Sequence, residues 1–285
     1  MKKQSILELV IPLLAMILMV PFNMGGCADV AGQLGAAVGG QQGEVIGRTA
    51  VKAAENESLN EKDEQAMGES VAMAVTTRYP IVKNSDLNQY VTLVGLTLAN
   101  ASRRPDGNWL FAVVDTSEVN AFSGPDGYVL LTRGLMKKLR DESELAGVIA
   151  HEMSHVLDQH GLKAVKQAGR ANAIASLAQA DQRTSAFSQL TDGLTDTILN
   201  KGYGREQEDQ ADADAIKLLV ATGYDPHGYL RFIERTALEQ HGKTGVMSTH
   251  PGAEDRAAKI RAKIDQLKPA KPGAVLRERF EKYVF

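Results

Sequence analysis

The stretch HEMSHVLDQHG, residues 151–161, decides how the rest of this 285-residue chain is interpreted. On an α-helix, residues four apart are offset by about 40° and rise about 6 Å, so His151 and His155 project from one face and can share one metal ion. Glu152 lies beside that face, where its carboxylate can reach a metal-bound water rather than the metal itself, as a general base requires. We therefore expect two metal ligands, His151 and His155, and one catalytic base, Glu152.

The helix carrying this motif is expected over residues 142–160 on independent grounds. Asp141 and Glu144 can cap its start, and apolar residues follow at helical spacing. Gly161 is expected to end it. His160 is then expected to point to a different side of this helix and to have a structural role.

Zinc in hydrolases commonly takes three protein ligands and leaves the fourth position to water, so a third ligand is needed. The segment GREQEDQADADA, residues 204–215, is a predicted helix that is rich in carboxylates. The candidates are Glu206, Glu208, Asp209, Asp212 and Asp214. Glu208 and Asp212 share a face, so one can ligate while the other orients a ligand. A solvated acidic face is the alternative, and spacing alone does not choose among these carboxylates.

The rest of the chain predicts a mostly helical α+β fold with a small sheet. WLFAVVD, residues 109–115, and YVLLT, residues 128–132, are the predicted strands. Helical patterns occupy most of the remainder. They cover two segments before residue 102, and roughly 133–140, 142–160, a pair within 162–200, 205–221, 226–239 and 252–267.

Composition is that of an ordinary globular protein, with 44% hydrophobic residues, 24% charged residues and a formal charge of −3. No basic excess favours nucleic acid as a partner, and we expect none. Cys27 is the single cysteine, so a disulfide within the chain is excluded.

Residues 1–27 have the pattern of a signal peptide. Two lysines precede the apolar run Leu9–Val20, which is short for a membrane-spanning helix. The run leads to MGGC, which ends at Cys27 and resembles the cleavage box of bacterial lipoproteins. We expect export to the periplasmic side of a bacterial membrane, with a lipid anchor on Cys27. Ordinary signal cleavage and an uncleaved anchor are the alternatives.

Three further segments complete the expected organisation. Residues 28–50 are Gly-rich and predict a tether, with a closely packed helix as the alternative. Residues 51–268 are expected to form the catalytic domain. Residues 269–285 contain two prolines and a short amphipathic stretch, and we expect a peripheral C-terminal tail.

HEMSH, followed by GREQEDQAD, resembles the HtpX and CAAX-prenyl-protease-like family of zinc endopeptidases, gluzincins whose third ligand is the Glu of an ExxxD motif. Glu208 and Asp212 occupy these two positions. The resemblance also includes EVNAFSGPDGYVLLTRGL, residues 118–135, and STHP followed by Arg256. It implies a zincin-like metalloprotease domain, one Zn²⁺ per chain with Glu208 as third ligand, and Asp212 as the residue that orients a ligand.

Two departures from the family pattern lie in the NAF turn. Ser123 stands where a small apolar residue is usual, and Asp126 stands where Gly is usual. The resemblance implies that the NAF segment is an edge strand, on which Asn120, Ala121 and Phe122 bind the backbone of an extended substrate. A plain hairpin corner is the alternative.

His250, Arg256 and Tyr203 are candidate donors to the oxyanion of the tetrahedral intermediate. His250 has a second candidate role, because a His beside the site could occupy the open zinc position and hold the enzyme latent. In the simpler alternative, His250 and Pro251 merely begin the last helix.

These features together favour an endopeptidase that cleaves unfolded or misassembled envelope proteins. An assembly factor or chaperone with a silenced protease site is the alternative. A catalytically dead, zinc-stabilised scaffold is a third, which the intact Glu152 disfavours.

Overall fold

The structure is a computed structural model, and the residues that it describes are 61–164, 192–239, 250, 252–269 and 273–285. All of them belong to the second of two compact units, Glu44–Phe285. The expected signal peptide, the lipid anchor site Cys27, the tether and the start of the catalytic domain lie outside these residues. Within them, every helix is too short or too polar to span a bilayer.

In the described part of the chain, three strands form one mixed sheet, in the order β1-β3-β2. Their bounds are Leu110–Val114 for β1, Ala121–Gly124 for β2 and Tyr128–Thr132 for β3. β1 runs parallel to β3, and β2 runs antiparallel to it with Ala121 opposite Leu131. Both predicted strands are confirmed, and the NAF segment supplies the third strand at an edge of the sheet.

A tight turn, Pro125–Gly127, joins β2 to β3. Gly127 has a φ of 105°, and a Cβ there would lie 2.6 Å from the carbonyl oxygen of Asn108, so this position requires glycine. Asp126 also adopts a left-handed conformation, with a φ of 62°. Asp tolerates this region better than most residues, and the Asn108 side-chain amide donates to its carboxylate at 3.3 Å. The departure at Asp126 is therefore compatible with the turn.

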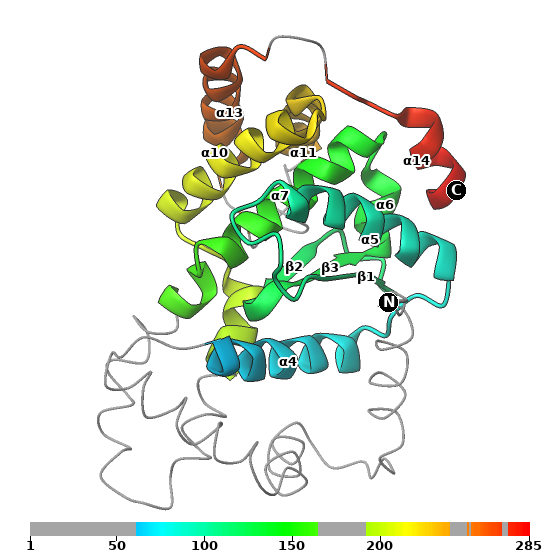
Figure 1. The fold of residues 1–285 in the computed structure, drawn as a ribbon, viewed down its shortest axis with the longest axis vertical. Helices are drawn as coiled ribbons and strands as arrows, with labels where there is room; N and C mark the ends of the chain where they lie inside the picture. The colour runs from blue at the N-terminus through cyan, green and yellow to red at the C-terminus, as the bar shows by residue number, and fades with distance from the viewer. Residues whose placement is uncertain (1–60, 165–191, 240–249, 251, 270–272) are drawn as a thin grey trace, which may run out of the picture. The chain divides into compact units, whose positions relative to one another are not determined.

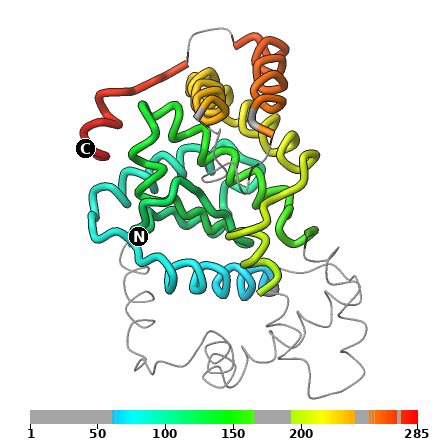
Figure 2. Tube along the Cα trace, turned by 180° about the vertical axis from the view of Figure 1, so that it is seen from behind, coloured from blue at the N-terminus to red at the C-terminus, as the bar shows by residue number. Residues whose placement is uncertain are grey.

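The sheet has a helix layer on each face, because successive side chains of a strand point to opposite faces. Phe111 and Val113 face α5 (Ser85–Asn100) and α7 (Glu142–Leu157), whereas Ala112 and Val114 face α4 (Glu61–Arg78). Figure 1 shows α4 on one side of the sheet and α5 and α7 on the other, and Figure 2 shows the same layers from behind. This packing seats the motif helix α7 directly on the sheet.

The remaining elements complete the expected mostly helical fold. They are α6 (Arg133–Lys138), a π-helical turn η3 (Thr197–Lys201), α10 (Arg205–Thr222), α11 (Pro226–Glu239), α13 (Ala253–Leu267) and α14 (Arg277–Val284). Of these, α10 and α11 both pack against α7. Predicted and observed boundaries agree within about three residues where the structure describes them. The helix pair predicted within residues 162–200 lies largely outside the described residues.

The motif helix ends at Leu157 instead of continuing to His160. Residues 158 and 159 form a turn in which Gln159 takes a left-handed φ of 53°, and helical structure resumes at His160. Gly161 has a packing role, since a Cβ there would lie 2.8 Å from Leu194. The predicted start is confirmed, because the Asp141 side chain accepts from the backbone N–H of Glu144 at 3.0 Å.

Glycines let α11 approach α7 closely. A Cβ on Gly147 of α7 would lie 2.4 Å from the Cβ of Tyr229, and one on Gly228 of α11 would lie 2.1 Å from the Ser143 hydroxyl oxygen. Neither position can hold a larger side chain without separating the two helices. The close approach places Tyr229 beside the motif helix.

Buried carboxylates at the start of α7 each pair with an arginine from the C-terminal part of the chain. The pairs are Asp141 with Arg231, Glu144 with Arg235 and Glu142 with Arg279. Glu142 also accepts hydrogen bonds from the hydroxyls of Tyr90 at 2.9 Å and Tyr224 at 2.6 Å. Buried charges are tolerated when they are paired in this way, so the start of the motif helix is fixed from several directions.

Residues 273–285, the main described part of the expected C-terminal tail, are held against the core by α14. Arg279 of α14 reaches Glu142, the ring of Tyr283 stacks on Tyr90 with centroids 4.7 Å apart, and Phe280 is fully buried. The aromatic residues in this segment supply the apolar area that holds it against the core.

Phe280→Ala is predicted to destabilise the chain by about 3–5 kcal/mol, because it removes a fully buried aromatic ring. Phe285→Ala is the matched control, since its side chain is 78% exposed, and it should change stability by less than about 0.5 kcal/mol. Urea unfolding followed by circular dichroism measures both. Equal small effects would show that α14 does not contribute to the core.

Candidate metal centre

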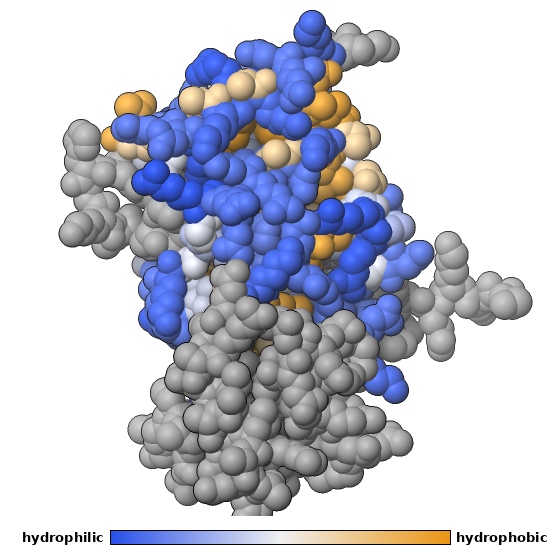
Figure 3. All heavy atoms as spheres, turned by 90° about the vertical axis from the view of Figure 1, so that its left-hand side faces the viewer, coloured by the Kyte–Doolittle hydropathy of each residue, from blue (hydrophilic) through white to orange (hydrophobic). Residues whose placement is uncertain are grey.

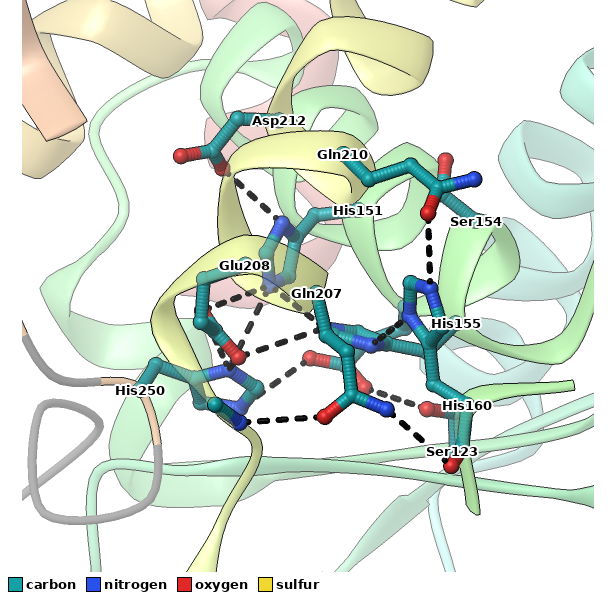
Figure 4. Close-up of polar contacts among 12 residues, drawn as sticks. Ser123, His151, Ser154, His155, His160, Gln207, Glu208, Gln210, Asp212 and His250 are labelled. Carbon is teal, nitrogen blue, oxygen red and sulfur yellow. Dashed lines mark hydrogen bonds and ion pairs between the residues drawn. The ribbon is translucent and has the colours of Figure 1, made fainter. Parts of the chain in front are cut away.

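Four potential ligand atoms converge between α7, α10 and the segment before α13. They belong to His151, His155, Glu208 and His250, and all lie within 4.8 Å of one another. The Nε2 atoms of His151 and His155 are 3.1 Å apart, and Nδ1 of His250 lies 3.3 Å from the former. Nδ1 of His250 is also 3.0 Å from Oε1 of Glu208. Figure 4 shows the side chains pointing toward one another.

The spacing and chemistry of these atoms fit a tetrahedral zinc ion. Ligand atoms about 2.0–2.1 Å from zinc in a tetrahedron lie about 3.3 Å from each other. The contacts from His151 and His155 to the Glu208 carboxylate, 3.5 Å each, are close to this separation. Formal charge agrees as well. With the histidines in the neutral form that binds metal, three buried carboxylates and one buried guanidinium leave an excess of two negative charges that a divalent cation would neutralise. These groups are Glu152, Glu208, Asp212 and Arg256.

The two motif histidines differ in their protonation. Burial and the neighbouring His151 lower the pKa of His155 well below its ordinary value, which favours the neutral form that binds metal. Burial also lowers the pKa of His151, but contacts with Asp212 and Glu208 outweigh it and raise this pKa to about 9. Metal binding would therefore displace a proton from His151.

Glu208 and Asp212 are the carboxylates of α10 that face the motif helix. Both are buried, and Oδ1 of Asp212 lies 3.0 Å from Nδ1 of His151. The other acidic residues of this helix are more exposed, namely Glu206, Asp209 and Asp214. Figure 3 shows a mostly hydrophilic surface over the face that carries α10 and α13. The acidic segment is thus a solvated face on one side and part of the metal centre on the other.

Arg256 is nearly fully buried and binds the carboxylates of α10. Its Nε and one terminal nitrogen each donate to Asp212 at 2.7 Å, and its other terminal nitrogen lies 3.0 Å from Glu208 and donates to the His250 carbonyl at 3.3 Å. The hydroxyl of Tyr229 donates to Asp212 at 2.8 Å. Arg256 is one of three candidate oxyanion donors in the sequence, and in this structure its guanidinium contacts Asp212, Glu208 and the His250 carbonyl.

Arg256 also keeps the carboxylates ionised. Burial alone would raise the pKa of Asp212, but the Arg256 guanidinium outweighs this and lowers the pKa to about 2. Burial opposes ionisation of Glu208 too, yet the charge of His250 and hydrogen bonding from His151 hold its pKa below the usual range. Both groups can therefore act as anionic partners of a histidine–metal unit.

His160 and Tyr203 support His155 in ways that the sequence did not reveal. Nδ1 of His160 lies 2.8 Å from Nδ1 of His155, and its Nε2 lies 3.3 Å from the side-chain oxygen of Gln210. The ring of Tyr203 stacks on His155 with centroids 4.2 Å apart. The expected placement of His160 on another side of the helix is wrong, because α7 ends before it. The proximity of a third histidine in HEMSHVLDQH was the available signal.

Glu152, the expected base, is buried beside the cluster. Its Oε2 accepts a hydrogen bond from the Ser123 hydroxyl at 2.7 Å, and its Oε1 lies 3.5 Å from Nε2 of His250. In the sequence, Ser123 stands out only as a departure from a family pattern. The contact joins the sheet to the motif helix at the acidic residue of HExxH.

The edge strand β2 leads toward this centre. The backbone N–H of Thr132 on β3 donates to the Asn120 carbonyl at 3.0 Å. In an antiparallel ladder alternate residues bond to the neighbouring strand, so the backbone groups of Phe122 also point to β3. The backbone groups of Ala121 and Ser123 point away from β3. The Asn120 side chain accepts from the Ala121 N–H at 2.9 Å. A small cavity beside the end of β2 is lined by residues that include Ser123, His155 and Tyr203.

Comparison with known proteins identifies the family. The sequence profile of Peptidase family M48 matches residues 85–264. The chain is 28% identical to the beta-barrel assembly-enhancing protease of Yersinia pestis over 228 residues, which cover 74% of this chain and 46% of that protein. It thus spans about half the length of the beta-barrel assembly-enhancing proteases that it matches.

Two shorter proteins of Escherichia coli strain K12 are also similar. Metalloprotease LoiP is 28% identical over 211 residues, 73% of this chain and 82% of LoiP. Metalloprotease YcaL is 33% identical over 161 residues, 54% of this chain and 61% of YcaL. Residues 85–264 make up more than half of the chain and include Glu152 and the whole histidine–glutamate cluster. The protein therefore belongs to Peptidase family M48, and it carries the intact HExxH motif and ligand cluster of a zinc metallopeptidase of that family.

Proposed function

We propose that this chain is a zinc-dependent endopeptidase that hydrolyses peptide bonds of unfolded or misassembled envelope proteins. The observation that carries the proposal is the convergence of His151, His155 and Glu208 on one point, with the Glu152 carboxylate 3.5 Å from the adjacent His250 ring. Three protein ligands leave a fourth position for water or substrate, which is the arrangement of catalytic rather than structural zinc.

In this proposal Zn²⁺, when bound, lowers the pKa of water and polarises the scissile carbonyl. Glu152 takes the proton of the attacking water and gives it to the leaving amine. Asp212 fixes the ring of His151, and Arg256 fixes Asp212. Tyr203 is a candidate oxyanion donor, because burial raises the pKa of its hydroxyl and keeps it protonated, and because it lines the cavity beside β2.

The edge position of β2 supports the proposed binding of an extended polypeptide by strand addition. The expected contact residues are Asn120, Ala121 and Phe122. By the ladder alternation, Ala121 and Ser123 are the residues whose backbone groups would pair with substrate. Strand addition requires an unfolded or loosely folded segment, which is consistent with misassembled proteins as substrates.

Envelope substrates are proposed on two grounds. The relatives that match most of this chain include proteases named for enhancing beta-barrel assembly. The N-terminal pattern also predicts export and a lipid on Cys27, which would hold the enzyme at the periplasmic side of a membrane. An assembly factor with a latent protease site is the second candidate function, and the position of His250 favours it.

His250 lies where it would complete a four-ligand set. Its Nδ1 is within 3.3 Å of both His151 and Glu208, so it stands at the corner that water or substrate needs. We propose that this arrangement is a latent form, from which His250 must withdraw before cleavage. The alternative role of His250 as an oxyanion donor would require it to remain near the site during turnover.

Glu208→Gln is predicted to weaken zinc binding at least about 100-fold, because it removes an anionic ligand. Glu206→Gln is the matched control, since it lies two residues earlier on the same helix with an exposed side chain. Zinc titration against a chromophoric chelator measures both. Equal zinc affinity in the two variants would contradict the assignment of Glu208 as a ligand.

Glu152→Gln is predicted to reduce cleavage of an unfolded protein by about 10²–10⁴-fold while zinc stays bound, because it removes the general base and no ligand. The measurement is the cleavage rate of denatured casein by the zinc-loaded chain, with metal content assayed in both proteins. Undiminished cleavage at equal zinc would rule out Glu152 as the base. A zinc-loaded wild type that cleaves nothing would favour the assembly-factor function.

His250→Ala is predicted to raise the cleavage rate, by up to about tenfold where roughly a tenth of the wild-type molecules are competent. The expected cause is the opening of the fourth position. The same casein assay at matched zinc occupancy measures it. A lower rate would instead assign His250 to oxyanion stabilisation.

A further inference from the structure

We infer that Ser123 is a positioning residue for the catalytic base: its hydroxyl aims the Glu152 carboxylate, while its backbone belongs to the strand edge that receives substrate. This inference rests on the proposed endopeptidase function. It assigns a role to the residue that departs from the family pattern in the NAF turn.

The hydrogen bond between these residues is short and buried. The Ser123 hydroxyl donates to Oε2 of Glu152 at 2.7 Å, and the two residues are 4% and 2% exposed. A hydroxyl bound to a carboxylate at this distance forms a charge-assisted hydrogen bond, which is stronger than one between neutral groups. Figure 4 shows Ser123 reaching the centre from the sheet side.

The bond distinguishes the two oxygens of Glu152. Oε2 is held by Ser123, whereas Oε1 is the oxygen on the side of His250, 3.5 Å from its Nε2. The terminal torsion of a glutamate is otherwise broad, so the carboxylate has no strong preference of its own. Ser123 therefore determines which oxygen faces the ligand cluster.

The place of Ser123 in the strand links substrate to base. On β2 the side chains of Ala121 and Ser123 share one face of the sheet, and Ala121 packs in the core that includes α7. The backbone groups of these same residues face away from β3. A peptide that pairs with this strand edge would thus contact Ser123, whose side chain orients Glu152. Ser123 would therefore bind substrate through its backbone and position the base through its hydroxyl.

The test is Ser123→Ala, a variant that restores the small apolar residue usual in the family. We expect kcat for casein to fall about tenfold, with KM within twofold of the wild type and with unchanged zinc content, since an interaction with the base acts on the chemical step. Ser70→Ala is the control. Its hydroxyl donates to the Ala66 carbonyl within α4 at 2.8 Å, and both constants should be unchanged.

A double-mutant cycle provides a readout that does not depend on activity. Unfolding of the zinc-free chain is measured for the wild type, Ser123→Ala, Glu152→Ala and the double variant. We expect Ser123→Ala to destabilise the chain clearly less in the Glu152→Ala background. Equal destabilisation in both backgrounds would show that the hydroxyl does not act through Glu152 and would overturn the inference.

The outcomes separate this inference from the proposed function. A wild type that cleaves casein, together with a Ser123→Ala variant of unchanged kcat, would overturn the positioning role alone. A change confined to KM would also overturn it, because it would assign Ser123 to substrate binding only. A zinc-loaded wild type without cleavage would overturn the endopeptidase function and the catalytic role of Ser123 with it, and the cycle would then decide only whether the contact exists.

Discussion

The buried guanidinium of Arg256 is the interaction on which the metal centre depends. It binds Asp212 with two nitrogens and reaches both Glu208 and the His250 carbonyl. Arg256, on α13, therefore orients the ligand Glu208 on α10. It also orients Asp212, which contacts the ligand His151 on α7, and the segment that carries His250. Burying such a charge costs several kcal/mol unless its donors find partners. Here the partners are Asp212, Glu208 and the His250 carbonyl, which need a fixed orientation in the metal centre. The same contacts therefore pair the buried guanidinium and orient the groups of the centre.

The opposite end of the motif helix is fixed by the same kind of pairing. Glu142 at its start binds Arg279 and two tyrosine hydroxyls, which come from α5, α14 and the turn after α10. The helix that carries His151 and Glu152 is thus anchored at its start by paired charges and at its end by the ligand cluster. Reacting groups must be held within fractions of an ångström, and a helix with two fixed ends provides that.

The sequence predicted those features that depend on residues close together in the chain. The i, i+4 spacing placed His151 and His155 together, strand composition located β1 and β3, and Asp141 marked the start of α7. The errors lie where one backbone angle or a distant partner decides. The backbone of Gln159 is left-handed although the residue is not a glycine, so the sequence does not signal this turn. The turn brings His160 into contact with His155. The contact of Arg279 with Glu142 joins residues 137 positions apart, so the sequence pattern alone could not show that this amphipathic stretch packs on the core.

Among the described residues, Ser123 and His250 both contact Glu152, and they differ in how they could move. Ser123 belongs to a strand that is paired along its length with β3, so it cannot withdraw without breaking the sheet. His250 precedes α13 and is held by the Arg256 contact to its carbonyl and by the ligand cluster. On the proposed mechanism, a four-coordinate zinc has one position beyond its three protein ligands, and His250 and substrate compete for it. Departure of His250 would leave the base still aimed by Ser123, so activation requires the loss of one ligand and no rearrangement of the acid–base group.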